Sequence, residues 1–462
     1  MGTQGTNDSG AAPPAPSDKP IRPTGMRGFT IIWAGQLVSL LGTGMTQFAI
    51  TIWAWQTTGI ATTLALVGFF TAVPQILTSP LAGAIVDRYD RKHVMILSDL
   101  AAGIATIAFL VLYSGGHLQV WHLYVISAFS GAFGAFQFPA YSATVSTMLS
   151  KEQYGRASGM IALAEAASGI VAPISAGILL NVIGIEGIMA IDILTFIVAI
   201  GALLMTHIPQ PHLEETAKAE RGSIWEDSVF GFKYIFKRPG LLGLLTVFLL
   251  LNFILSFSFT LFAPMILART GDDTLILGAV QSAFGVGGIV GGVIMSAWGG
   301  PKKRINGVIL GMAIVSLLTC FFGIGRNMTL WAPTAFLVMA FLPILNGSSQ
   351  AIWQSKVPPA MQGRVFATRS LIARVASPIS MAITGPLADW IFEPGMMSGG
   401  SLVPVFGWLV GTGPGAGIAV LFVVMGVFGS ITSLAGYSIR SIRDLETLIP
   451  DYDAPSGQEA PS

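Results

Sequence analysis

The stretch GAIVDRYDRKH, from Gly83 to His93, places a cluster of charged side chains between two long apolar segments. Such clusters are rare here, because only 10% of the 462 residues are charged and 53% are hydrophobic. Soluble domains contain about 25% charged residues. A chain with so little charge cannot cover the surface of a soluble protein, and the composition therefore indicates an integral membrane protein. The quoted stretch then marks a loop between two membrane spans.

Outward from this loop, the chain contains twelve apolar runs that are long enough to cross the roughly 30 Å hydrocarbon layer as helices. They lie near residues 28–55, 62–86, 93–113, 119–146, 157–182, 185–206, 241–268, 274–299, 305–324, 330–352, 364–390 and 413–437. The sequence therefore predicts an all-α membrane protein with twelve transmembrane helices.

The basic residues predict the orientation of these helices. Twenty of the 24 Lys and Arg residues fall on the side of the predicted membrane that carries both chain ends, whereas Arg269 and Arg326 fall on the other side. Loops rich in Lys and Arg stay in the cytoplasm. We therefore expect a multi-pass protein of the cytoplasmic (inner) membrane with both termini in the cytoplasm.

Polar segments divide the chain into domains. The first of them is rich in Pro, Ala, Gly and Ser, which is typical of disorder, and the piece from Ile224 to Phe236 is amphipathic, as expected for a helix on the membrane surface. The expected domains are a disordered cytoplasmic tail (1–25), a six-helix bundle (26–206), a cytoplasmic linker with an amphipathic helix (207–240), a second six-helix bundle (241–437) and a cytoplasmic tail (438–462).

Several classes of protein are excluded by composition and motifs. The net charge of +1 does not fit a strongly basic nucleic-acid binder. The single cysteine, Cys320, excludes an intramolecular disulfide and a cysteine-based metal cluster. No GxxxxGK[ST] motif occurs, and the five histidines are not at metal-ligand spacing. We therefore expect no bound metal, no other cofactor and no Walker-type ATP site.

The two sets of six helices look like copies of each other. GAIVDRYDRKH, beginning at Gly83, corresponds to GVIMSAWGGPKKR, beginning at Gly292 and 209 residues later. The pair Gly155-Arg156 corresponds to Gly363-Arg364, 208 residues later. A shared offset at two separated landmarks favours an internal duplication, and parallel six-helix repeats are one way in which transporters build a central site. We expect two pseudo-symmetric six-helix bundles.

The loop motif and four other stretches carry a family resemblance. GAIVDRYDRKH resembles the signature of the major facilitator superfamily, although Asp90 replaces a glycine often found there and Ser296 stands in the second half where an acid could stand. SPLAGAIVDRYDRK, FQFPAYSATVSTMLS, AIWQSKVPPAMQGRVFATR and ITGPLADWIFEP resemble its drug-exporter branch, which contains macrolide-efflux and enterobactin-exporter proteins. The resemblance extends from about Phe29 to Tyr437 and implies the major facilitator fold.

The resemblance also implies a gate on the cytoplasmic side, where the second and eleventh helices meet. Asp87 would lie near the positive N-terminal end of the eleventh helix and accept charge-assisted hydrogen bonds there. The alternative is a loop that is charged only to fix topology. The predicted gate residues are Gly83, Asp87, Arg88, Arg91 and Arg364.

Charged residues inside the predicted spans indicate possible functional positions, because each is costly in a membrane. They are Asp99, Glu165, Asp192, Arg369 and Arg374. Glu165 and Arg374 are 209 residues apart, the offset of the repeat, so one half places an acid where the other places a base. A carboxyl group in low-dielectric surroundings binds protons readily.

We therefore predict that Glu165 carries or couples to a proton and that Arg374 biases its charge or an anionic ligand group. Asp99 and Asp192 are further candidates. The alternative for all four is a buried polar group satisfied by neighbouring helices. Many exporters of this branch have an acid in the first helix after Leu-Gly, where this chain has Thr43.

If the superfamily arrangement holds, the first, fourth, seventh and tenth helices line a cavity. Each of these helices carries polar residues at helical spacing, with aromatic residues nearby. Such a chamber suits bulky amphiphiles, whereas packing between helices is the alternative for any single residue. The predicted cavity residues are Gln36, Thr43, Gln47, Gln137, Tyr141, Asn252, Asn346, Gln350 and Trp353.

These observations predict a secondary transporter and not an enzyme. The resemblance implies proton-coupled efflux of a hydrophobic or amphipathic small molecule, such as a drug, a siderophore or a peptide natural product. The expected partners are this substrate, protons and the lipid bilayer, without nucleic acid, for a protein that acts as a monomer. A lysophospholipid flippase of the same fold is an alternative. A membrane-embedded enzyme is another, but it would need a His/Asp pair or metal-binding acids at the membrane face, and the sequence offers neither.

Overall fold

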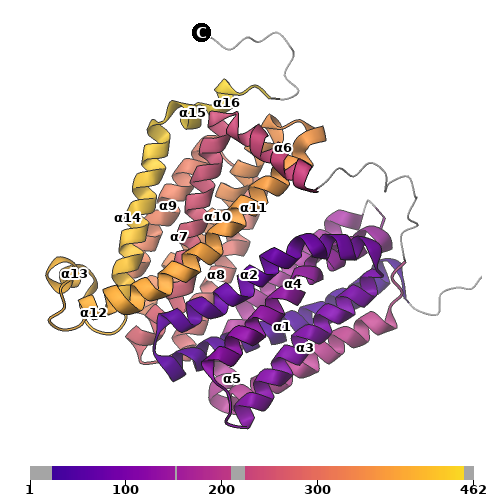
Figure 1. Cartoon of the computed structure of the whole chain (residues 1–462), viewed down its shortest axis with the longest axis horizontal. Coiled ribbons are helices and arrows are strands. Elements are labelled where there is room, and N and C mark those ends of the chain that lie inside the picture. The colour runs from indigo at the N-terminus through magenta and orange to yellow at the C-terminus, as the bar shows by residue number, and fades with distance from the viewer. Residues whose placement is uncertain (1–22, 151–152, 210–223, 452–462) are drawn as a thin grey trace, which may run out of the picture.

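The computed structural model describes residues 23–150, 153–209 and 224–451, and every regular element in these residues is a helix (Figure 1). The long helices are α1 (Gly25–Thr58), α2 (Ala61–Arg88), α3 (Arg91–Ser114), α4 (Val120–Met148), α5 (Tyr154–Met205), α7 (Pro239–Thr270), α8 (Thr274–Trp298), α9 (Arg304–Ile324), α10 (Met328–Lys356), α11 (Pro359–Leu387) and α14 (Ala416–Ser438). The short ones are α6 (Ile224–Phe236), the π-helical turn η3 (Ala388–Phe392), α12 (Glu393–Met396), α13 (Val403–Val410), α15 (Arg440–Arg443) and α16 (Leu445–Leu448).

Eleven of the described helices are long and apolar enough to cross a membrane, and α5 accounts for two spans. Its 52 residues would extend roughly 78 Å as one straight helix, more than twice the hydrocarbon thickness. Gly184 interrupts it with φ 67° and ψ −173°, a backbone conformation that favours glycine. The break falls between the predicted fifth and sixth runs, and the prediction of twelve transmembrane helices is confirmed.

The helices form two bundles that lean against each other (Figure 1). We call α1–α5 the N-terminal bundle and α7–α11 with α14 the C-terminal bundle. They meet where α5 packs on α8 and where α2 packs on α11. Glycines allow the backbones of α5 and α8 to approach closely: a methyl group at Gly278 would lie 2.6 Å from the carbonyl oxygen of Pro173.

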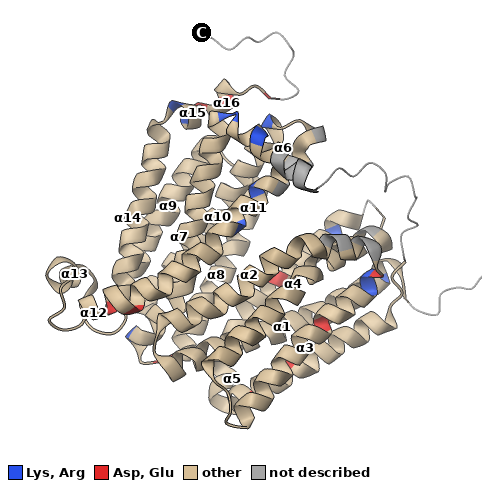
Figure 2. Ribbon diagram, viewed as in Figure 1, with Lys and Arg blue, Asp and Glu red and all other residues tan. Residues whose placement is uncertain are grey.

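Most charged residues lie at the two ends of the bundles, and a few lie part-way along the helices (Figure 2). We call the end that carries α6, α15 and α16 the basic face, because most described Lys and Arg residues lie there. The end that carries α12 and α13 is the opposite face. Arg269, which lies there, donates hydrogen bonds to the carbonyl oxygens of Gly325 at 2.7 Å and Val410 at 2.9 Å, and so ties three segments together.

The sequence does not predict η3, α12 and α13, which connect the last two spans at the opposite face. The eight residues of α13 are apolar but too short to span a membrane. Glu393 holds this connection to α14, because its carboxylate accepts hydrogen bonds from the backbone N–H groups of Gly415 at 3.1 Å and Ile418 at 2.8 Å.

Candidate functional site

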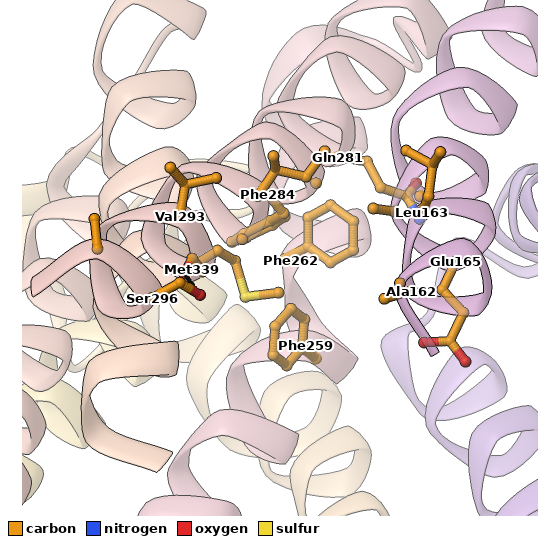
Figure 3. Close-up of a pocket in the computed structure, with 18 residues that line it drawn as sticks. Ala162, Leu163, Glu165, Phe259, Phe262, Gln281, Phe284, Val293, Ser296 and Met339 are labelled. Carbon is orange, nitrogen blue, oxygen red and sulfur yellow. Dashed lines mark hydrogen bonds between the residues drawn. The ribbon is translucent and has the colours of Figure 1, made fainter. Parts of the chain in front are cut away.

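A cavity of about 1080 Å³ lies between the two bundles, with α5 on one side and α7, α8 and α10 on the other. Figure 3 shows Leu163 and Glu165 on the α5 side, across from the rings of Phe259, Phe262 and Phe284. The walls are mostly apolar and aromatic, so the cavity suits a bulky hydrophobic or amphipathic molecule.

The only ionisable residue among those that line this cavity is Glu165. It lies eleven residues into α5, about 16 Å along the helix axis and therefore near the middle of the hydrocarbon layer. The side chain is exposed, and within the described chain it forms no hydrogen bond or ion pair. Its carboxyl group is therefore available to a proton or to a ligand.

The glycines of α8 have two different roles. Gly287 and Gly291 face α10, where a methyl group would lie 2.1 Å from the carbonyl oxygens of Phe336 and Ala340. Gly288 and Gly292 line the cavity, and a methyl group there would have no neighbour within 4 Å. One stripe thus allows close helix packing, whereas the other leaves the cavity wide.

In the N-terminal bundle, Asp99 joins two predicted cavity residues that come from different helices. Gln36 on α1 donates to one carboxylate oxygen of Asp99 at 2.9 Å, and Gln137 on α4 donates to the other at 2.8 Å. Gln137 also donates to Gln36 at 3.1 Å. Asp99 is 2% exposed and Gln36 is 4% exposed. These residues therefore form one network, in which Asp99 and Gln36 are buried and Gln137 is half-buried.

Asp192 is the centre of a second buried network. Thr43 donates a hydrogen bond to it at 3.3 Å and Thr106 at 2.8 Å, so that both carboxylate oxygens have a partner. Tyr141 is also buried and lies against Phe29, with ring centroids 6.1 Å apart. Asp99 and Asp192 thus each have a hydrogen-bond partner on both carboxylate oxygens.

In the C-terminal bundle, a pocket of about 380 Å³ forms around Arg369. The guanidinium group of Arg369 donates to Gln350 at 2.9 Å and to Ser349 at 3.4 Å. It lies 5.6 Å from the ring centroid of Phe248 and 5.3 Å from that of Trp353, within cation–π range.

Asn252, Asn346 and Gln350 line this pocket, whereas Trp353 is fully buried behind it. The sequence marks Arg369 as a charge inside a span. The equivalent position in the first half of the chain carries no opposite charge. Only the fold shows that the predicted polar residues of α7 and α10 surround Arg369.

The remaining predicted residues lie apart from these groups. Arg374 lines a separate pocket of about 460 Å³ between α11 and the α2–α4 pair, and within the described chain it forms no ion pair with Glu165. Gln47 lines a small pocket between the bundles near Phe259 and Thr260.

Most of the predicted gate lies outside the described side chains. Gly83 and the side chains of Asp87, Arg88 and Arg364 are not described. Arg91 is described and donates a hydrogen bond to the carbonyl oxygen of Ala143 on α4 at 2.6 Å.

At the opposite face, side chains of the C-terminal bundle hold the N-terminal bundle. Asp389 in η3 accepts hydrogen bonds from the backbone N–H groups of Ala61 at 2.9 Å and Thr62 at 2.7 Å, and from the Thr62 hydroxyl at 2.5 Å. It therefore caps the N-terminus of α2 across the interface. Trp55 donates to Asp272 at 2.8 Å.

Two further hydrogen bonds between the bundles lie along α5 and α8. Thr274, at the start of α8, donates to the carbonyl oxygen of Gly177 at 3.4 Å. Ser282, two turns deeper, donates to that of Ile170 at 2.6 Å.

Two six-helix bundles with a cavity between them define a membrane transporter of the secondary type. The model of the Major Facilitator Superfamily matches residues 32–381, well over half of the chain, and the chain belongs to this superfamily.

Its relatives include efflux proteins. The chain is 26% identical over 365 residues to Macrolide efflux protein A of Streptococcus pyogenes, with 79% of this chain and 90% of that protein covered. It is 24% identical over 373 residues to the Multidrug efflux pump Tap of Mycolicibacterium fortuitum, covering 78% and 88% of the two chains. The resemblance to the drug-exporter branch is thus confirmed.

Solved structures share the fold at low identity. A bacterial homologue of the human lysosomal transporter Spinster matches with a TM-score of 0.65 and 13% identity, over 90% of this chain and 98% of that one. The nucleoside transporter NupG matches with a TM-score of 0.64 and 10% identity, over 89% and 98%. These matches confirm the major facilitator fold.

Proposed function

We propose that this protein exports a hydrophobic or amphipathic small molecule in exchange for protons, by alternating access. The observation that carries the proposal is the apolar, aromatic cavity between the two bundles, with Glu165 as its only ionisable lining residue. The cavity can hold the apolar body of a substrate, and the carboxyl group can exchange a proton with it. The efflux relatives support the direction of transport.

The arrangement of the bundles supports a cavity that opens at the basic face. Described hydrogen bonds between the bundles lie from mid-depth to the opposite face, and the loops of the basic face carry most Lys and Arg residues. Positively charged loops remain in the cytoplasm. The basic face is then cytoplasmic, and the state described here would accept substrate from the cytoplasm or from the inner leaflet.

Within this proposal, Glu165 is the coupling residue. Asp99 and Asp192 are buried and hydrogen-bonded on both carboxylate oxygens, so they would change partners only if helices within the N-terminal bundle moved against one another. Arg374 lies in another pocket and would act on Glu165 through the long-range field. This assignment makes Glu165→Gln the decisive variant.

The test is substrate-dependent proton release from proteoliposomes, screened over a panel of amphiphilic compounds and one radiolabelled lysophospholipid. We expect at least one amphiphile to release protons with the wild type. Glu165→Gln should reduce this release at least tenfold. The matched control is Glu186→Gln, because Glu186 is exposed beyond the break in α5 and does not line the cavity.

Full proton release by Glu165→Gln would remove this residue from the mechanism. If no compound of the panel moved protons, proton-coupled export would be wrong. Flipping of the lipid without proton release would favour the flippase alternative.

We also propose that Gly83, Asp87, Arg88, Arg91 and Arg364 form the gate on the basic face. When the bundles close there, Asp87 would accept hydrogen bonds near the N-terminus of α11. Asp87→Asn should then slow transport and favour the state that is open at the basic face. Unchanged transport and an unchanged balance between the two open states would contradict the gate.

A further inference from the structure

The pocket around Arg369 has an unbalanced positive charge. Among the described residues, the partners of its guanidinium group are the neutral oxygens of Gln350 and Ser349 and the faces of two aromatic rings, and no carboxylate pairs with it. Arg369 lies ten residues into α11, about 15 Å along the helix axis. A charge at this depth is costly, and such residues typically mark the path of a ligand or an ion.

From this geometry we propose that the Arg369 pocket binds the oxyanion group, a carboxylate or a phosphate, of an amphiphilic ligand. A guanidinium group has five N–H donors, and only two described hydrogen bonds use them. Its planar fork matches a carboxylate or a phosphate in bidentate geometry. The rings of Phe248 and Trp353 stabilise the guanidinium group by cation–π contacts.

The other groups of the pocket fit the same ligand. Asn346 is exposed in the pocket, and no described residue forms a hydrogen bond with its side chain. Asn252 contributes a second amide, one N–H of which is held by the carbonyl oxygen of Phe248 at 2.8 Å. Neutral amides can donate to an oxyanion without adding charge, so the pocket would select a single anionic group.

The position of the pocket also defines the rest of the ligand. Asn252 lies on α7 two turns before Phe259, about 10 Å along the axis, and Phe259 lines the large cavity between the bundles. A ligand with its head at Arg369 could therefore lay its apolar part toward that cavity. The oxyanion site itself does not depend on the proposed function. Only the statement that its ligand is a transported amphiphile rests on that function.

Equilibrium binding to the whole purified protein tests the proposal without requiring transport. The probes are radiolabelled octanoate and octyltrimethylammonium, which share an apolar chain and differ in the charge of the head. In nanodiscs of phosphatidylcholine, we expect Arg369→Gln to weaken octanoate binding at least tenfold and to leave octyltrimethylammonium binding within twofold of the wild type. The matched control is Arg326→Gln, which removes a charge from the same bundle at an exposed position that does not line the pocket and should leave octanoate binding unchanged.

If Arg369→Gln does not fold, Asn346→Leu keeps the test decisive, and we expect it to weaken octanoate at least threefold without affecting the cation. Equal octanoate affinity in wild type and Arg369→Gln, or an equal loss in Arg326→Gln, would overturn the proposal. For Asn346→Leu, unchanged octanoate affinity would do the same.

Nanodiscs with added phosphatidylglycerol separate two sources of the oxyanion. Octanoate affinity that stays unchanged assigns the pocket to a transported anion. A weakened affinity that depends on Arg369 assigns it to a lipid headgroup, and both results keep the oxyanion site. If octanoate binding depends on Arg369 but no amphiphile releases protons, the proposed proton-coupled export is wrong, whereas the proposed oxyanion site is supported.

Discussion

The two ends of the interface between the bundles differ along a single face of α8. Gly278, Gly285 and Gly292 are seven residues apart and therefore lie on the same side of the helix. A methyl group at Gly278 would lie 2.6 Å from Pro173 on α5, and one at Gly285 would lie 2.5 Å from Ile170. At Gly292, nearest the basic face, it would have no neighbour within 4 Å.

Polar contacts follow the same gradient. Asp389, Trp55 and Thr274 join the bundles at the opposite face, and Ser282 joins them near mid-depth. Closer to the basic face, no hydrogen bond between the bundles is present among the described side chains. Closure of the opposite face therefore rests on a few specific contacts, each of which can be removed separately.

Gly278→Val should have the largest effect, because its side chain would push α8 away from the α5 backbone at the closed end. Overpacking of this kind costs about 1–3 kcal/mol. We expect the balance to shift at least tenfold toward the state that is open at the opposite face. The measurement is the distance between spin labels at Ile60→Cys and Met397→Cys, two exposed positions on either side of that end, in a Cys320→Ala background.

Gly292→Val is the matched control, since it adds the same side chain to the same face of α8 where there is space. Its label distances should equal those of the wild type. Identical distances in the two glycine variants would contradict the idea that close packing at Gly278 holds the end shut.

Asp389→Ala should have the next largest effect. It removes the cap of α2, and the loss of an N-cap costs about 0.5–2 kcal/mol. This cost falls only on the state in which the bundles are closed at the opposite face, because the cap crosses the interface. We expect the same label pair to report a shift of about tenfold toward the open state.

Asp273→Ala is a control with the same chemistry inside one bundle. Asp273 caps α8 of its own bundle by accepting from the N–H groups of Leu275 and Ile276 at 2.9 and 3.0 Å. It should lower thermal stability without moving the label distance. A shift as large as that of Asp389→Ala would mean that the loss of any nearby cap, and not the contact across the interface, opens this end.

Much of the fold could be predicted from the sequence, because hydrophobic runs are local. The twelve spans follow from run length, and the separation of the fifth and sixth runs agrees with the break at Gly184. The cap of α2 could not be predicted, because Asp389 and Thr62 are 327 residues apart and meet only through the packing of two bundles.

The candidate site could also be predicted only in part, because residue type and position in a helix are local but contacts between helices are not. Periodicity places Gln36 and Gln137 on polar stripes of two helices, but it does not show that both turn to Asp99 on a third. Arg369 is visible as a charge inside a span, yet its neighbours come from three helices. Residue type and depth are local properties, whereas partners across helices depend on the packed structure.

Trp55→Phe should have a smaller effect than either variant above. It keeps the aromatic ring in the core and removes the hydrogen bond to Asp272, worth about 1 kcal/mol. We expect a roughly fivefold shift toward the open state with the same labels. Trp33→Phe is the control, because the Trp33 indole donates to the carbonyl oxygen of Met160 within the N-terminal bundle at 2.6 Å. Equal shifts in both would show that the indole hydrogen bond at the interface has no special part in closure.

Ser282→Ala should give the smallest shift, since one interhelical hydrogen bond in a membrane protein contributes about 0.6 kcal/mol on average. This corresponds to a roughly threefold change in the balance between the two states. Ser296→Ala, on the same helix, removes a hydrogen bond to the carbonyl oxygen of Gly292 in its own helix and should cause no change. Because Ser282 lies where the closed part of the interface ends, we expect its hydrogen bond to break last when the opposite face opens. An effect of Ser282→Ala larger than that of Asp389→Ala would therefore reverse the gradient and place the main closing contact at mid-depth.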